Sequence, residues 1–380
     1  MMHLAPELLT PRRTAARGAD AVNTATLTYS TDGKYLFQRE AHVIRVLNTK
    51  NGQLLHECIR SEAQPLGAIA GDAKAAQENK TSDSTAAAVR NGDRQQVTAL
   101  ALHPHNALQL IASYEDGKVL VWDFSEEKIL QEFDAKASIL WMESSSVSPS
   151  MLMMVVTPED STVAASKWSL IEFNMKKKRR GRTLLEQSKL TFKSASMGSY
   201  KDSNDAAATT SDDRFNGDYV VIVAGARMFG VRVQREQDGS VGMGRPFTTQ
   251  KYTHLRDVTC VAVHPSAAEF VIGDSLGQLY RHHGQGAATT SKMHWHAHAV
   301  KCVTYSSDGN FLVSGGEECV FVSWHIESGR RSYLPRRSAS LSAIATRADG
   351  AGYAIALEDH VLFQYNHITK EEEWHALGLA

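Results

Sequence analysis

Short runs in which apolar and polar residues alternate recur along the chain, and most of them end at a turn that contains glycine or acidic residues. The clearest group lies between His294 and Pro335, where the runs are Val300 to Tyr305, Phe311 to Val313 and Val320 to Trp324. Alternation with turn residues between the runs predicts an antiparallel meander of short strands. Such a unit, of roughly 40 residues and four strands, is typical of one blade of a β-propeller. Because a single blade cannot bury both of its faces, we expect further copies along the chain.

Copies of this unit precede and follow it. The best copy runs from Val97 to Phe133: Asp116 precedes the glycine of a tight turn, and the third strand closes at Trp122 and Asp123, the dipeptide typical of WD repeats. Another copy begins at Val258, and degenerate copies occupy residues 26–58, 138–173, 190–233 and 341–380. The predicted fold is therefore all-β, a WD-repeat β-propeller of seven four-stranded blades over residues 26–380. The degenerate copies leave six or eight blades as alternatives.

Two stretches do not fit the blade pattern. Residues 61–96 are rich in Ala, Ser, Asn, Asp and Lys, and residues 194–216 are rich in Ser, Thr, Asp and Ala. Segments with so little apolar surface cannot offset the entropy of ordering, so both are predicted to be disordered loops inserted between strands. Residues 1–25 precede the first copy. Either they complete the last blade, or the segment around Trp374 completes it alone.

The composition allows one large repeat ring or two ordinary domains, with 380 residues, 42% of them hydrophobic, and a formal net charge of −1. This charge disfavours nucleic-acid binding over a broad surface but permits a local basic patch. Four cysteines without C-x-x-C spacing fit a reducing intracellular compartment. No apolar run reaches the length of about 18 residues that a membrane span needs, and the arginine-bearing start lacks the apolar region of a secretory signal.

The best-defined unit also carries the residues that indicate a family. His294-Trp295-His296 is followed by Ala299-Val300, by Leu312 to Glu318, by Val320 to Trp324 and by Leu334-Pro335-Arg336. This combination resembles the N-terminal propeller of the WD repeat-containing protein 75 family, closely so over about the last quarter of the chain. The resemblance implies a nucleolar subunit of the transcription-coupled (t-UTP) subcomplex of the small-subunit processome. It also implies a second propeller and a helical C-terminal tail, which have no counterpart here, so we expect a fragment or a protein without that part.

Histidines in the blade pattern are candidates for structural roles. His254 and His296 each lie four residues before a predicted strand. In WD repeats a histidine at this place hydrogen-bonds to a serine of the second strand and a tryptophan of the third, here Ser314 and Trp324, with Glu318 as the acidic turn residue. The alternative is a metal or catalytic site made by the alternating histidines at positions 294, 296 and 298. It lacks the converging carboxylate or cysteine that usually completes such a site.

Positive charge is concentrated in two places. The first is one run of six charges in seven residues, namely Lys176, Lys177, Lys178, Arg179, Arg180 and Arg182. Like charges at this density repel one another, so the run is predicted to be solvated, in a loop or edge hairpin of blade three. A nuclear localisation signal, a phosphate-contacting patch for RNA and a plain solvated loop all fit it. The second place is around blade six, where the arginines are expected to extend a basic edge: Arg330, Arg331, Arg336 and Arg337.

No catalytic motif accompanies these features, because the sequence shows neither a glycine-rich phosphate loop opening a helix nor an H-E-x-x-H. We therefore expect no enzyme, cofactor, metal, membrane or small-molecule substrate. Together with the resemblance, the sequence predicts a non-enzymatic scaffold of ribosome biogenesis in the nucleus and nucleolus, acting in pre-rRNA transcription and processing. Its expected partners are other t-UTP and processome propeller proteins, with pre-rRNA or snoRNA. The alternative is a generic WD-repeat adaptor for a peptide, such as a ubiquitin-ligase substrate receptor, which predicts basic or aromatic residues around the central channel.

Overall fold

The structure is a computed structural model that describes residues 27–376 except 61–94, 105, 159–166, 201–215, 236–246, 255, 268 and 284–288. In the described part, every helix or strand is a β-strand, and the 28 strands form seven four-stranded sheets. Within each sheet the strands follow one another in chain order, so each sheet is one meander. The predicted all-β propeller of seven blades is confirmed, and the alternatives of six or eight blades are wrong.

The strands divide into blades as follows. Blade one contains β1 (Leu27–Tyr29), β2 (Tyr35–Glu40), β3 (Val43–Asn48) and β4 (Leu54–Ile59), and blade two contains β5 (Val97–Leu102), β6 (Gln109–Tyr114), β7 (Lys118–Asp123) and β8 (Lys128–Asp134). Blade three contains β9 (Ser138–Ser144), β10 (Met151–Thr157), β11 (Trp168–Asn174) and β12 (Arg179–Gln187), and blade four contains β13 (Phe192–Tyr200), β14 (Gly217–Ala224), β15 (Arg227–Gln234) and β16 (Phe247–Thr253). Blade five contains β17 (Val258–Val263), β18 (Phe270–Asp274), β19 (Gln278–His283) and β20 (Thr289–His294). Blade six contains β21 (Val300–Tyr305), β22 (Phe311–Gly316), β23 (Phe321–His325) and β24 (Arg331–Tyr333), and blade seven contains β25 (Leu341–Thr346), β26 (Gly352–Leu357), β27 (Leu362–Asn366) and β28 (Glu371–Ala376).

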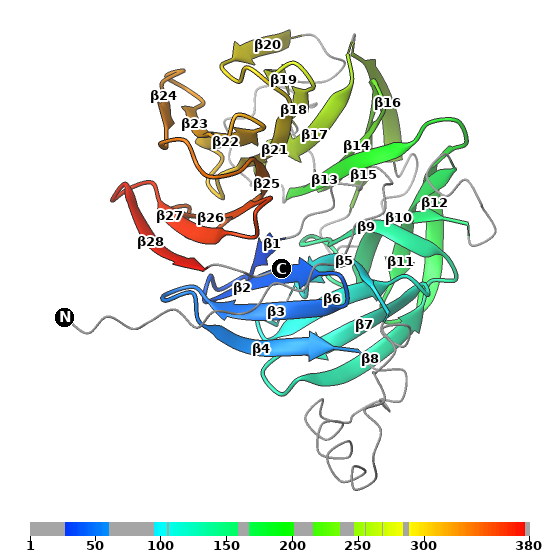
Figure 1. Cartoon of the computed structure of the whole chain (residues 1–380). Helices are drawn as coiled ribbons and strands as arrows, with labels where there is room; N and C mark the ends of the chain where they lie inside the picture. The colour runs from blue at the N-terminus through cyan, green and yellow to red at the C-terminus, as the bar shows by residue number, and fades with distance from the viewer. Residues whose placement is uncertain are drawn as a thin grey trace, which may run out of the picture.

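The blades stand around a central axis, with the first strand of each blade innermost and the fourth on the outer edge (Figure 1). Because neighbouring strands are antiparallel, the turns between first and second strands and between third and fourth strands lie on one face of the ring. With the four strands of a blade lettered A to D in chain order, we call this the C–D face. The turns between second and third strands and the connections between blades lie on the opposite face, the B–C face.

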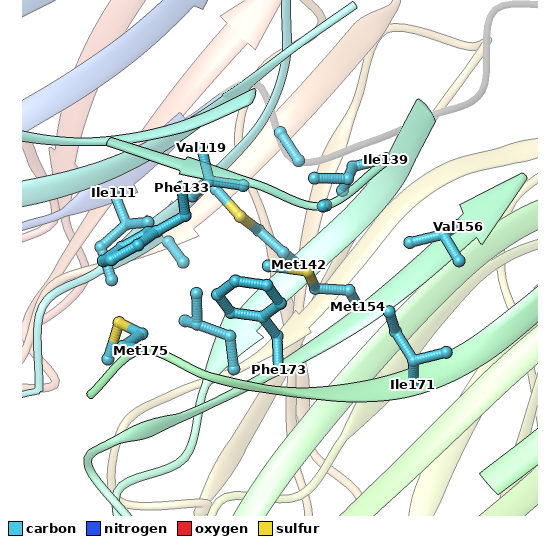
Figure 2. Close-up of a cluster of buried hydrophobic side chains, with 14 of the residues drawn as sticks. Ile111, Val119, Phe133, Ile139, Met142, Met154, Val156, Ile171, Phe173 and Met175 are labelled. Carbon is cyan, nitrogen blue, oxygen red and sulfur yellow. The ribbon is translucent and has the colours of Figure 1, made fainter. Parts of the chain in front are cut away.

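The core is a series of apolar layers, each shared by two neighbouring blades. Figure 2 shows the layer between blades two and three, where Phe133 and Phe173 pack with ring centroids 5.8 Å apart beside Met142 and Met154. Trp122, Trp168 and Trp324 are buried in the layers between blades one and two, three and four, and five and six. Each blade therefore buries the apolar faces of its sheet against the two neighbouring blades, and the large indole rings contribute much of the buried area.

The turns follow the sequence prediction closely. Gly117 and Gly309, each preceded by aspartate, have φ of 77° and 75°, a conformation that glycine adopts without a side-chain clash. One strand is longer than predicted, because β22 continues through Ser314, Gly315 and Gly316 instead of ending there. At Gly315 a Cβ atom would lie 2.8 Å from the Leu341 Cβ, so the small residues admit the neighbouring blade and do not mark a turn.

The second predicted disordered loop, residues 194–216, is partly wrong. Ser194 to Tyr200 belong to β13, the innermost strand of blade four. Their small side chains suit a crowded inner strand, where a Cβ atom at Gly198 would lie 2.9 Å from the His264 carbonyl oxygen. The serines have partners, since Ser196 Oγ accepts a hydrogen bond from the Val263 N–H at 3.1 Å. Low apolar content therefore did not mean low burial at this strand.

The other predictions about loops and termini concern residues that lie partly outside the described part of the chain. Residues 201–215 of the second loop, residues 61–94 of the first and residues 1–25 lie outside the described residues. Blade seven already has four strands between Leu341 and Ala376, and the segment around Trp374 is its outer strand β28.

Candidate nucleic-acid and partner interface

Blade six contains a complete hydrogen-bonded chain that joins its turn to its third strand. Trp324 Nε1–H donates to Ser314 Oγ at 3.0 Å, and Ser314 Oγ lies 2.7 Å from His296 Nε2. The other imidazole nitrogen, Nδ1, contacts the Glu318 carboxylate. Since indole N–H only donates and carboxylate only accepts, the hydroxyl donates to Nε2 and Nδ1–H donates to Glu318. His296 is fully buried, so this chain fixes the residues that precede β21.

Blade two fills the same space with different chemistry. Trp122 Nε1–H donates to Tyr114 Oη at 3.1 Å, and the Arg60 guanidinium lies over the Tyr114 ring at 5.0 Å. Arg60 also pairs with Asp116 at 2.8 Å, where blade six has Glu318. Asp123 accepts from the Ser125 hydroxyl at 2.6 Å and so holds the turn after β7.

Blade five does not form this chain. His254 Nε2 lies 3.5 Å from Asp274 Oδ2, and its ring packs edge-on against Tyr280 at 4.5 Å. By register, Ile272 stands where blade six has Ser314, and His282 stands where it has Trp324. The predicted equivalence of His254 and His296 therefore holds for position but not for partners.

Lowering the pH is expected to destabilise blade five through His282. The ring stacks on Phe270 at 4.7 Å, and burial, together with the imidazoles of His254 and His283, lowers the pKa of His282 to about 4. An unfolded histidine titrates near 6.5, so the stability supplied by the neutral ring is present above that pH and is lost as the pH falls towards about 4. In urea titrations, His282→Phe should show a weaker loss of unfolding free energy between pH 6.5 and 4 than the parent protein. An unchanged pH slope would contradict this assignment.

The basic run of blade three is divided by the structure. Lys176 to Lys178 form the turn between β11 and β12 on the C–D face, and Arg179 to Arg182 begin β12 on the outer edge. All residues from Lys176 to Arg180 are exposed. Lys178 Nζ lies 5.7 Å from the centre of the Phe133 ring. The remaining four exposed cations have no ion pair within the described residues, and we call them the blade-three patch: Lys176, Lys177, Arg179 and Arg180.

Arg182, the sixth charge of the run, belongs to a buried network instead. Its Nε lies 3.0 Å from Glu172 Oε2, and Glu172 Oε1 lies 2.9 Å from Arg235 Nη2. Arg235 in turn donates to Asp218 Oδ2 from Nε at 3.0 Å and from Nη2 at 2.9 Å. The other Asp218 oxygen accepts from Ser145 at 2.7 Å and from Ser199 at 2.8 Å. The network ties blade three to blade four.

The arginines of blade six do not extend this patch. They are three blades away from blade three, and β24 lies on the opposite side of the ring from β12 (Figure 1). Arg330 and Arg331 lie in the β23–β24 turn and on β24, whereas Arg336 and Arg337 lie on the connection to blade seven. Arg337 pairs with Glu372 at 2.9 Å and stacks on Phe363 at 4.2 Å, so it holds blades six and seven together. One continuous basic edge is therefore the wrong description.

The innermost strands, all of them described, carry little charge or exposed aromatic surface. Their aromatic side chains are buried between blades, and their partly exposed positions are mostly small or aliphatic. Lys193 pairs with Asp257 at 3.6 Å, and Lys301 pairs with Glu317 at 3.5 Å and with Glu358 at 3.4 Å. The ring of basic or aromatic residues that the adaptor alternative predicts does not line these strands.

A metal site, a membrane span or a catalytic nucleophile would each need a particular arrangement of the described residues. There, no cluster of three or more His, Cys, Asp or Glu side chains has a metal-binding arrangement, and the searched residues contain no helix with the length and apolarity of a membrane span. His296 is buried, while His294 and His298 are exposed. Gly273 to Gly277 have the G-x-S-x-G spacing of a serine nucleophile elbow, but they join β18 to β19 instead of leading into a helix.

Comparison with known proteins places this ring in a family. A family model described as the WD repeat-containing protein 75 first beta-propeller matches residues 58–360, from β4 to the turn after β26. The chain belongs to this family. The resemblance predicted from the residues between His294 and Arg336 is thereby confirmed and extended from the end of blade one to the second strand of blade seven.

Curated relatives agree with membership of the WD repeat-containing protein 75 propeller family. U3 small nucleolar RNA-associated protein 17 of Schizosaccharomyces pombe is 25% identical over 291 residues, which is 74% of this chain and 33% of the relative. WD repeat-containing protein 75 of Danio rerio is 24% identical over 273 residues (71% and 31%), and that of Homo sapiens 22% over 356 residues (90% and 36%). The chain spans about a third of the length of these relatives.

Sequence reasoning missed two buried charges that join blades three and four of this propeller, Arg235 and Glu172. Their one signal is position, since Glu172 interrupts the apolar strand β11 and Arg235 directly follows β15. A charge inside an apolar run is a sign of a buried partner, but the sequence does not say which partner.

Proposed function

We propose that this protein is a non-enzymatic scaffold of ribosome biogenesis, a nucleolar component of the small-subunit processome that acts on pre-rRNA. The observation that carries the proposal is family membership together with a relative named for its association with U3 small nucleolar RNA. The match covers only about a third of the length of each relative, so the proposal concerns the part played by one propeller.

The propeller would act by rigid presentation of its edges. Seven sheets packed face to face hold their outer strands in fixed positions, which suits docking of other t-UTP and processome propeller proteins. The blade-three patch offers four cations that have no ion pair within the described residues, on one turn and one edge strand, a geometry that fits the phosphates of pre-rRNA or snoRNA. The same exposed basic run would also act as a nuclear localisation signal.

The peptide-adaptor alternative receives less support. Such an adaptor would bind its peptide near the channel, where the innermost strands present mainly small and aliphatic positions and paired lysines. The blade-three patch, whose four cations have no ion pair within the described residues, lies on a turn and on the outer strand of blade three instead. The distribution of charge therefore favours an edge-binding scaffold.

Reversing the charge of the blade-three patch is expected to remove RNA from the purified protein. The variant carries Lys176→Glu, Lys177→Glu, Arg179→Glu and Arg180→Glu, and a fused heterologous import signal separates import from RNA contact. After crosslinking and tagged pull-down from nuclear extract, we expect at least a ~10-fold loss of the 5′ part of pre-rRNA, because each lost phosphate contact removes counterion release. In vitro, the slope of log affinity against log salt should fall by about 3 for four contacts with a single strand.

A matched control has the same change of net charge spread over four exposed cations on other blades: Lys50→Glu, Lys136→Glu, Arg227→Glu and Lys370→Glu. It should retain pre-rRNA. Equal loss in both variants would mean that net charge and not the patch matters. Recovery of a cytoplasmic set of partners without pre-rRNA or processome proteins, by the parent protein itself, would overturn the proposed function and favour the adaptor.

A further inference from the structure

The outer edge of blade six carries an aromatic ring that is open to solvent. Tyr333, the last residue of β24, is 62% exposed, and its ring stacks on Trp295 with centroids 5.6 Å apart and planes inclined by 27°. Trp295 follows β20 of blade five, so the pair bridges two blades where both fourth strands end at the B–C face. One face of Tyr333 is thus supported by Trp295.

The support is rigid because it is tied to the buried chain of blade six. Trp295 packs edge-on against His296 at 5.4 Å, and His296 is held by Ser314 and Glu318. Trp295 also packs against the apolar layer between blades five and six. An aromatic ring that is fixed before binding loses little conformational entropy when a ligand stacks on it.

Positive charge lies beside the aromatic pair. Arg331 and Tyr333 are two residues apart on β24 and pair with Trp324 and Val322 of β23, so both side chains lie on the side of the sheet that faces blade five. Arg330 and Arg336, at the two ends of this edge, are also exposed. These three arginines form no ion pair with the described residues, and Glu327 in the β23–β24 turn is the acidic residue of this edge.

We propose that this edge is a stacking site for an unpaired base of single-stranded RNA. The base would lie on the open face of Tyr333, and the three arginines would contact the flanking phosphates. Two residues along a strand are about 7 Å apart, which is the distance between the backbone positions of Arg331 and Tyr333. A duplex cannot present a base in this way, since its bases are already stacked. An acidic peptide would use the arginines but would gain little from a pre-stacked aromatic pair, so the combination favours RNA. The proposal rests on the proposed function and adds a second RNA contact across the ring from the blade-three patch.

The test uses the whole chain with the blade-three patch changed to alanine, so that the remaining RNA binding reports blade six. Fluorescence anisotropy with a labelled single-stranded oligouridylate should show about a 5- to 150-fold loss of affinity for Tyr333→Ala, and near-parent affinity for Tyr333→Phe. Ile368→Ala, an exposed apolar residue that is 69% accessible on blade seven, is the matched control and should bind as the parent. Thermal melts establish that each variant is folded.

A second probe separates stacking from charge. On an abasic oligonucleotide with the same phosphates, Tyr333→Ala should bind as the parent, whereas Arg330→Ala with Arg331→Ala should still weaken binding. No effect of Tyr333→Ala on oligouridylate, equal effects on both probes, absence of all RNA binding, or tighter binding of polyglutamate than of RNA would each overturn the stacking site. In nuclear pull-downs, pre-rRNA that remains bound despite such an outcome would leave the proposed function standing without this site.

Discussion

Asp218→Ala is expected to lower the free energy of unfolding by about 3–5 kcal/mol, because it leaves a buried guanidinium without its main counter-charge. Arg235 and Asp218 are both fully buried within the seam of blades three and four, and Asp218 accepts two hydrogen bonds from Arg235 and two from serines. Urea unfolding followed by tryptophan fluorescence would measure the loss.

The control for this prediction is an ion pair that is exposed to solvent. Lys118 and Glu132 lie 2.8 Å apart with both side chains about 40% exposed, so Glu132→Ala should change stability by about 1 kcal/mol or less. A second comparison is Asp218→Ala combined with Arg235→Met, which removes both charges and should recover part of the loss. If Asp218→Ala destabilised no more than Glu132→Ala, the network would not be what joins blades three and four.

The blade pattern could be predicted because its signals are local. Apolar runs such as Met151 to Val156 became strands, and aspartate–glycine pairs such as Asp308-Gly309 became turns with positive φ. The fourth strand of blade four, β16, escaped prediction because Phe247–Thr253 is mostly polar. An outer strand needs no apolar face towards the core, so its sequence gives no periodic signal.

The candidate site could be predicted only in part, because charge density is local whereas partners are not. The sequence predicted exposure of the run at Lys176, but Arg182 turned out to be tied to Glu172 and Arg337 to Glu372. The four charged members of the blade three–four network, Glu172, Arg182, Asp218 and Arg235, are spread over three strands and a strand end. Only the folded ring decides which cations remain available for a partner.

Ring closure is a further property that the sequence left open. Blade seven meets blade one through Trp374, whose Nε1–H donates to the Thr49 carbonyl oxygen at 2.8 Å, and through Gln364, which donates to the same oxygen at 2.9 Å. Tyr29 Oη donates to Gln364 Oε1 at 2.9 Å. These residues are more than 300 positions apart, with separations of 325, 315 and 335. Closing the ring therefore fixes both ends of the repeat array at once.

Trp374→Ala is expected to open this closure and to cost about 3–5 kcal/mol, the usual range for removing a buried tryptophan. The indole is 92% buried, and it lies against Gly52, where a Cβ atom would come within 2.5 Å of its ring. Because β1 has only three residues, we expect hydrogen exchange in the strands of blades one and seven to rise before that of blade four. Urea unfolding and hydrogen exchange with mass spectrometry measure the two effects.

Two variants of the same strand distinguish closure from a general weakening of β28. His375→Ala removes the exposed neighbour of Trp374 and should change stability by no more than about 0.5 kcal/mol. Trp374→Phe keeps an aromatic ring but loses the hydrogen bond to Thr49, so about 1 kcal/mol should be lost on that account, in addition to a smaller packing loss than in the alanine variant. If Trp374→Ala raised exchange equally in all blades, closure would not be a separate step. The seven sheets would then unfold as one unit, held by the apolar layers between them and not by the contacts between blade one and blade seven.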